Sequence, residues 1–316
     1  MAEKRGTVTQ MKEHKPRSAM ALVIFAVCMV SYSGPMVKGA LGEGASPISV
    51  ALFRMLGAAL LLLPFELRQC IRKRVPFVLA PREWGWTLLS ALFLAGHYVT
   101  WITSLQGTST FASVALVCTQ PLFVALFSYW LFKERMPRNA LPGAFLALAG
   151  AVVIALSGMA GQQGAADGDA LSSNLLALAG AVLMAAHWLT ARHIRSTLSA
   201  EVYTPVLYLL TAGLLACLLP GSGGFQMPVR ALPYMAGLII GSTLLGHAVF
   251  AYALSRVSAN VVSFALLGEP VGAMIFSMLF FGEVPTALVM VGGVLTLLGL
   301  GLYLAAPMQS KQDKAC

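Results

Sequence analysis

Charged residues are scarce in this chain. Asp, Glu, Lys and Arg make up 10% of its 316 residues, and hydrophobic residues make up 58%. Mean hydropathy is +0.79, and a soluble domain usually carries about 25% charged residues. Because so few charges cannot cover a water-facing surface, most of the surface must face lipid, which leaves no room for a sizeable soluble domain.

The sequence also lacks the patterns of most cofactor sites. It contains no CxxC pair, no metal-ligand spacing, no P-loop and no GxGxxG. Five cysteines occur without paired spacing, as expected for small core residues and free thiols. We therefore expect no cofactor, no metal and no pump driven by its own ATP hydrolysis, unless a partner supplies the motor.

Long apolar segments make up most of the sequence. A helix needs roughly 20 apolar residues to cross the hydrocarbon core of a bilayer. Basic residues precede the first run, as in a signal peptide, but the run is long enough to span and more spans follow, so we interpret it as an uncleaved helix. The predicted fold is an all-α membrane protein with ten transmembrane helices, at residues 19–39, 47–66, 84–105, 109–132, 139–158, 171–190, 203–220, 232–254, 259–281 and 286–306.

The chain repeats itself at a fixed offset of 149 positions. The offset relates Pro121 to Pro270, Glu134 to Glu283, Gly143 to Gly292 and Gly150 to Gly299. We predict a first five-helix repeat at 19–158 and a second at 171–306, with cytoplasmic tails at 1–18 and 307–316. Since five is odd, the second repeat must be inverted in the membrane, which is typical of alternating-access transporters. The alternative is a duplicated static bundle or a channel.

Basic residues predict the orientation. With both termini in the cytoplasm, all but three of the 21 Lys and Arg lie in cytoplasmic segments. The exceptions are Arg230, Lys38 near a helix end and Arg54 within a span. This bias follows the positive-inside rule, and a basic inner face suits anionic lipid, so the net charge of +9 does not imply nucleic acid.

Several segments carry a resemblance to a known family. They include YSGPMVK ending at Lys38, ALFRMLGAALLLLP around Arg54, STFASVALVCTQPLFVALFSYWLFKE ending at Glu134, and SANVVSFALLGEPVGAMIFSMLFFGE ending at Glu283. With these segments the chain resembles the drug/metabolite transporter superfamily, EamA type. The first helix departs from the family pattern, because it reads Tyr-Ser-Gly where Trp-Gly is common.

The resemblance implies a secondary active or facilitative transporter that exports small metabolites across the inner membrane by alternating access. Typical cargo would be amino acids, purine-type compounds or drug-like cations. Proton coupling and uncoupled facilitated diffusion both remain open, and so does a homodimer. The alternative functions are a passive pore or, less favoured, an intramembrane enzyme, which would need a nucleophile or metal pattern.

Glu269 is the sharpest candidate for a functional residue. A carboxylate within a span is costly and usually faces a cavity or a partner. The first repeat has Gln120 at the matching position, which cannot exchange a proton. The alternative is a structural role, bonded near Pro270 or paired with Arg54. Pro35, Pro121 and Pro270 predict helix kinks, either as moving elements or as fixed bends.

Aromatic residues and histidines within the spans are further candidates for lining the cargo site. His97 and Trp101 are four residues apart and share one helix face. Each of these side chains also has a structural explanation. It could pack in the core, bond to a neighbouring backbone group as a neutral histidine, or lie at the membrane interface as part of an aromatic belt. The candidates are His97, Tyr98, Trp101, His187, Trp188 and His247.

Three features remain ambiguous in the sequence. A role of Lys38 in the cargo site and a purely structural role are equally compatible with the sequence. For Arg54 we favour a structural or snorkelling role over one that neutralises a cargo carboxylate. The glycine-rich fifth and tenth helices predict tight packing or a dimer face.

Overall fold

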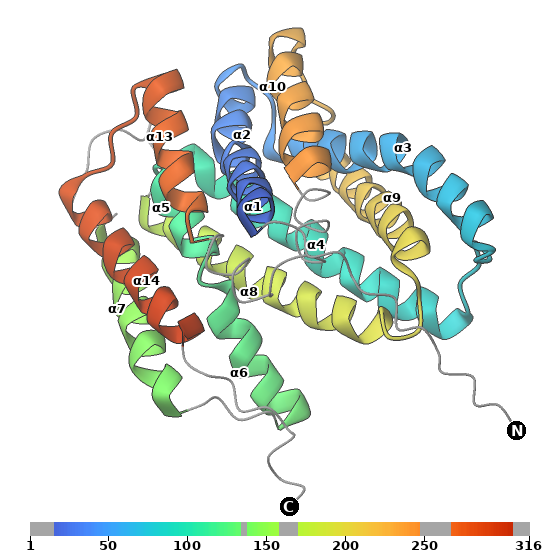
Figure 1. Ribbon diagram of the computed structural model, residues 1–316. Helices are drawn as coiled ribbons and strands as arrows, with labels where there is room; N and C mark the ends of the chain where they lie inside the picture. Colours follow the sequence, from blue (N-terminus) through green and yellow to red (C-terminus); the bar gives the residue numbers. More distant parts are fainter. Residues whose placement is uncertain (1–15, 134–137, 158–169, 247–266, 306–316) are drawn as a thin grey trace, which may run out of the picture.

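The computed structural model describes residues 16–133, 138–157, 170–246 and 267–305, and all regular structure within these ranges is helical (Figure 1). The main helices follow in chain order. They are α1 (Pro16–Ser31), α2 (Ser33–Gly42), α3 (Pro47–Lys73), α4 (Pro81–Gly107), α5 (Thr110–Val117), α6 (Gln120–Phe132), α7 (Leu141–Ser157), α8 (Ala170–Ile194), α9 (Ala200–Leu218), α10 (Leu232–Ala236), the π-helical η5 (Gly237–Gly246), α13 (Glu269–Phe281) and α14 (Ala287–Ala305). Short 3-10 turns lie at Arg138–Ala140 (η1), Pro220–Ser222 (η3) and Val229–Ala231 (η4).

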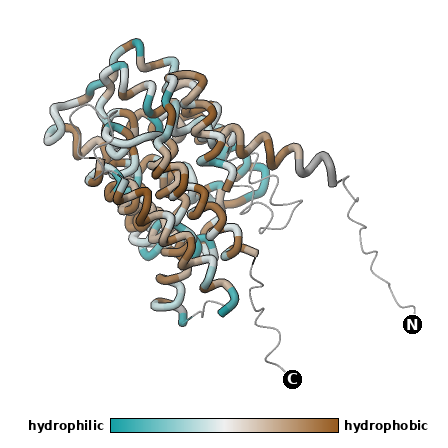
Figure 2. Tube along the Cα trace, turned by 90° about the vertical axis from the view of Figure 1, so that its left-hand side faces the viewer, coloured by the Kyte–Doolittle hydropathy of each residue, from teal (hydrophilic) through white to brown (hydrophobic). Residues whose placement is uncertain are grey.

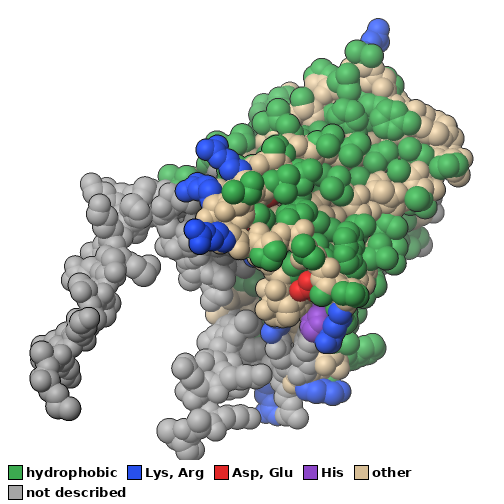
Figure 3. All heavy atoms as spheres, turned by 90° about the vertical axis from the view of Figure 1, so that its right-hand side faces the viewer, with side chains coloured by type: hydrophobic (Ala, Val, Ile, Leu, Met, Phe, Trp, Pro, Cys, Tyr) green, Lys and Arg blue, Asp and Glu red, His purple; other side chains and the backbone are tan. Residues whose placement is uncertain are grey.

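The all-α membrane fold is confirmed. Within the described residues, nine helical stretches are long and apolar enough to cross a membrane. Helix α13 is a shorter apolar helix and forms the described part of the predicted span 259–281, because residues 259–266 lie outside the described residues. Hydrophobic residues dominate the helices in Figure 2, and hydrophobic side chains predominate on the described part of the face drawn in Figure 3. Large exposed side chains such as Phe145 and Trp130 suit lipid contact.

Local chemistry sets the helix ends. Ser46 caps α3, with its hydroxyl accepting from the Ser49 N–H at 3.3 Å, and Pro47 follows at the first helical position. At the start of α4, the Glu83 carboxylate accepts from the Ala80 N–H at 2.8 Å. These caps satisfy backbone N–H groups that a helix cannot pair internally.

Breaks in the described helices lie near two of the three predicted kink residues, Pro35 and Pro121. The first span divides into α1 and α2 at Tyr32, three residues before Pro35. The fourth span divides into α5 and α6 just before Pro121. Pro35 and Pro121 each lack an N–H donor and crowd the carbonyl four residues earlier, which gives a physical reason for the interruption. Pro270 is the second residue of α13, and the part of its predicted span before residue 267 lies outside the described residues.

The second parts of the fourth and ninth spans are built alike. Helices α6 and α13 each contain 13 residues, and each ends at a left-handed residue, Lys133 with φ 57° and Gly282 with φ 63°. Their first residues, Gln120 and Glu269, are the pair that the sequence offset relates. The repeat therefore extends to helix length and capping geometry.

The packing of the helices follows the same relation. Helix α7 lies against α14, α4 against α8 and α3 against α9, and the first pair runs side by side in Figure 1. Helix α1 packs against η5, which pairs the first span with the eighth. Helix α8 packs against α4, which is the equivalent pairing of the sixth span with the third. Two five-helix repeats thus interlock, with inter-repeat contacts throughout the bundle.

Candidate functional site

Arg54 occupies the centre of a buried polar cluster. It lies on α3 and is 3% exposed. Its Nε donates to Thr243 Oγ1 of η5 at 3.0 Å, and its Nη1 donates to Ser33 Oγ of α2 at 3.2 Å. Since Thr243 belongs to the second repeat and Ser33 to the first, the guanidinium joins the two repeats.

Aromatic rings of α4 form one wall around this guanidinium. Arg54 Cζ lies 4.9 Å from the centroid of the Tyr98 ring and 5.9 Å from that of Trp101. His97 stacks on Trp101 with ring centroids 5.8 Å apart and planes 10° from parallel. The Nδ1 of His97 lies 2.9 Å from the Gly180 carbonyl oxygen of α8, which fixes the ring orientation. The predicted His97–Trp101 face therefore lies beside Arg54.

Glu269 completes the charges of this region. It is the first residue of α13, is partly exposed, and lies within electrostatic range of Arg54. The ion pairs within 4.0 Å among the described residues involve other groups, Lys38–Glu283 and Lys73–Glu201. Arg54 and Glu269 are thus close enough to interact electrostatically, but they do not form an ion pair within 4.0 Å.

A polar network ties the helices at one end of the bundle. Lys38 Nζ lies 3.1 Å from Glu283 Oε1 and donates to the Thr108 carbonyl at 3.2 Å. Glu283 also accepts from the Thr110 N–H at 2.6 Å and from the Thr110 hydroxyl at 2.8 Å. The Thr108 hydroxyl donates to Asn174 Oδ1 of α8 at 2.7 Å. We call this the Lys38 end, and its network joins both repeats.

A second network lies toward the opposite, Lys73 end, which carries the Lys73–Glu201 ion pair. Ser90 Oγ of α4 lies 3.0 Å from His187 Nδ1 of α8 and 2.7 Å from the Tyr203 hydroxyl of α9. This arrangement fastens three helices. It places His187 in a hydrogen-bond network separate from the aromatic wall beside Arg54.

The predicted site residues therefore fall into groups. Tyr98 and Trp101 lie beside Arg54, His97 stacks on Trp101, and Glu269 lies within electrostatic range of Arg54. Lys38 and His187 belong to the two networks nearer the ends. The Trp188 side chain is 57% exposed on the bundle surface, away from the cluster. His247 lies outside the described residues.

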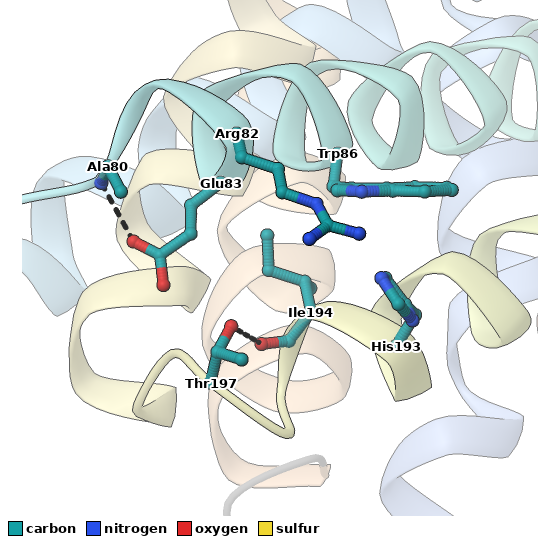
Figure 4. A pocket seen from close by; sticks show the side chains of 7 residues that line it. All are labelled: Ala80, Arg82, Glu83, Trp86, His193, Ile194 and Thr197. Carbon is teal, nitrogen blue, oxygen red and sulfur yellow. Dashed lines mark hydrogen bonds between the residues drawn. The ribbon is translucent and has the colours of Figure 1, made fainter.

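A small cavity of about 270 Å³ lies apart from this cluster, between the start of α4 and the end of α8 (Figure 4). The rings of Trp86 and His193 meet there with centroids 4.6 Å apart. None of the predicted site residues lines it. Its lining residues are Ala80, Arg82, Glu83, Trp86, His193, Ile194 and Thr197.

The sequence placed Arg54 within a span but did not predict its partners, Thr243 and Ser33. The sequence did carry a signal, because Arg54 is the arginine placed within a predicted span. A charge at that depth usually faces the bundle interior. The choice between snorkelling and an interior position depends on which helix face α3 turns inward, and packing decides that.

A lipid-embedded bundle of two related halves with a buried polar cluster at their junction is the architecture of multi-pass membrane transporters built from repeats. The chain belongs to the EamA-like transporter family, which its sequence matches over residues 17–156 and 171–305.

Similar proteins carry transporter names. An uncharacterized transporter of Bacillus subtilis, YdfC, is 27% identical over 266 residues, covering 82% of each chain. A probable terminal-alkyne amino-acid exporter of Streptantibioticus cattleyicolor is 25% identical over 289 residues, covering 90% of this chain and 93% of its own.

One solved structure, described as a crystal structure of a protein, matches with a TM-score of 0.60 at 20% identity. The match covers 93% of this chain and 99% of that one. At this identity the match shows a common fold.

Proposed function

We propose that this protein exports small metabolites, amino acids or drug-like compounds, across the inner membrane by alternating access. The observation that carries the proposal is the position of the Arg54 cluster. It joins residues of both repeats within the membrane, the place where transporters built from inverted repeats hold their cargo. The name of the Streptantibioticus relative favours amino acids among these cargo classes.

The polar network at the Lys38 end supports a carrier that is closed at that end. Lys38, Glu283 and Thr110 link the first and second repeats through charge-assisted hydrogen bonds. We assign this end to the outside, from the excess of Lys and Arg in the other connections, with both chain termini in the cytoplasm. The described arrangement is then the state closed toward the outside, and release would require this network to separate.

Glu269 is the proposed coupling residue. It is a carboxylate within a span, and a proton or a cationic group of the cargo could neutralise it in turn. Competition between the two for one carboxylate would couple outward movement of cargo to inward movement of protons.

Counterflow tests the proposed function. Purified protein in proteoliposomes preloaded with an unlabelled amino acid should accelerate entry of the labelled compound, and the rate should saturate. A pH gradient applied in parallel should change net transport. Single-channel currents would instead indicate a pore, and absence of exchange across amino acids, nucleobases and cationic drugs would contradict the carrier.

A further inference from the structure

The guanidinium of Arg54 is buried, and some of its donors have no partner among the described residues. It carries five N–H groups, and hydrogen bonds within the described residues use two of them, toward Thr243 and Ser33. Both acceptors are neutral hydroxyls. A buried positive charge is costly unless an acceptor of opposite charge offsets it.

The protein supplies no close anion among the described residues. The described ion pairs within 4.0 Å do not include Arg54. Residues 247–266, which lie between η5 and α13 in the sequence, contain no Asp or Glu. Glu269 is the carboxylate in electrostatic range, and it stands apart from Arg54.

A second buried donor in the same cluster is also unpaired. Trp101 is 6% exposed, and its indole Nε1 has no hydrogen-bond partner in the described part of the chain. Its ring lies beside the Arg54 guanidinium on one side and stacks with His97 on another. Buried polar groups without partners are uncommon in folded proteins and call for an explanation such as a missing ligand.

We propose that Arg54 binds the carboxylate of a small zwitterionic cargo through its unused N–H donors. The planar fork of the guanidinium matches the two oxygens of a carboxylate, which a lysine would not do. Glu269 faces the cationic end of the same molecule, and the rings of Tyr98 and Trp101 contact its apolar body. This inference rests on the proposed transport function and narrows its cargo to carboxylate-bearing compounds, in place of cationic drugs or neutral nucleobases.

Ligand series on the unmodified protein test the assignment without relying on any variant to fold. Binding to purified protein would be measured for valine, methionine, phenylalanine and tryptophan, each with its amide and its decarboxylated amine. At least one amino acid should bind about 10- to 100-fold more tightly than its amide, the range expected for hydrogen bonds to a charged group. Equal binding of acid and amide, or no binding by any of the acids, would overturn the proposal.

Variants then locate the effect. Arg54→Gln and Arg54→Lys should both weaken binding of the acid by about 10-fold or more and leave binding of the amide unchanged. Arg230→Gln, at an exposed position, is the matched control and should change neither. A parallel loss of acid and amide binding in the Arg54 variants would indicate a purely structural arginine and would also overturn the assignment.

Counterflow separates this inference from the transport function. If cationic drugs or nucleobases exchange while carboxylate-bearing compounds do not, the transport function is supported and the proposed carboxylate-binding role of Arg54 is contradicted. If no compound exchanges, the carrier itself is contradicted.

Discussion

Gly143 of α7 lies directly against Gly299 of α14, and a methyl group added at Gly143 would come within 2.7 Å of the Gly299 carbonyl oxygen. The sequence offset converts this pair into Gly292 and Gly150, and these two glycines make the same contact. Ala147 and Thr296, which the offset also relates, meet between the two pairs, with the Thr296 hydroxyl 3.5 Å from the Ala147 carbonyl. The two helices thus cross about a local two-fold relation, and small residues let their backbones approach.

Enlarging one of these glycines should separate the helices. Gly150→Ala places a methyl group 2.6 Å from the Gly292 carbonyl oxygen, against backbone that cannot move aside cheaply. We expect the free energy of unfolding in mixed micelles to fall by about 1–3 kcal/mol, the usual cost of overpacking. Gly213→Ala on α9 is the control, because an added methyl meets open space there and should stabilise the helix by up to about 1 kcal/mol. Equal effects of the two changes would contradict the close approach.

The Lys38–Glu283 pair should hold the Lys38 end closed. Lys38→Met removes the charge and keeps much of the side-chain volume, so the network around Glu283 loses a strong member. A cysteine introduced at Ser113, which is fully buried one turn beyond Thr110, should then react faster with an impermeant maleimide added at this end. The same measurement with Arg230→Met should show the wild-type rate. An unchanged rate in the Lys38 variant would argue against its role in closure.

Ser90 should matter more to stability than Tyr203, although both belong to one network. Ser90→Ala leaves the buried Tyr203 hydroxyl without its partner, whereas His187 keeps the Ser90 backbone carbonyl 3.2 Å from its Nδ1. Leaving a buried polar group unpaired costs about 1–3 kcal/mol. Tyr203→Phe removes one hydroxyl and leaves Ser90 bonded to His187, so its cost should be smaller. Thermal unfolding of both variants in lipid nanodiscs compares them. A larger loss for Tyr203→Phe would show that ring packing dominates this network.

Glu269 should connect transport to protons. Glu269→Gln keeps the shape of the side chain and removes the group that exchanges a proton. We expect proteoliposomes with this variant to retain counterflow at a lower affinity for cargo, because Glu269 also faces the cationic end of the cargo, and to lose the response of net transport to a pH gradient. Gln120→Glu, at the related position of the first repeat, should leave the gradient response of the wild type in place. Gradient-driven transport that persists in Glu269→Gln would remove Glu269 from the coupling.

Much of the fold was predictable from sequence. Apolar runs predicted the spans, because a helix needs about 20 apolar residues to cross the hydrocarbon core. The fixed sequence offset predicted the two repeats. Helix breaks occur shortly before Pro35 and Pro121, where the missing proline N–H interrupts the backbone hydrogen bonds. The glycine pattern alone was compatible with tight packing inside the chain or with a dimer face. In the structure, these glycines of α7 and α14 contact one another within one chain.

The site was less accessible from sequence, since a span that is apolar on all sides gives little sign of which face turns inward. His97 and Trp188 look alike in this respect, yet one is buried beside Arg54 and the other is exposed on the bundle surface. The same limit applies to Arg54, for which the sequence favoured a structural or snorkelling role and could not predict the partners. Its partners come from helices far apart in the sequence, and Thr243 is 189 positions away.

Accessibility of the Arg54 cluster from both sides of the membrane tests alternating access most directly. Thr243→Cys, in a chain without its native cysteines, places a thiol beside the guanidinium of Arg54, where residue 243 is 3% exposed. In proteoliposomes the thiol should react with an impermeant maleimide from either face, and cargo should slow both reactions. Labelling from one face alone, under every cargo and pH condition, would contradict alternating access.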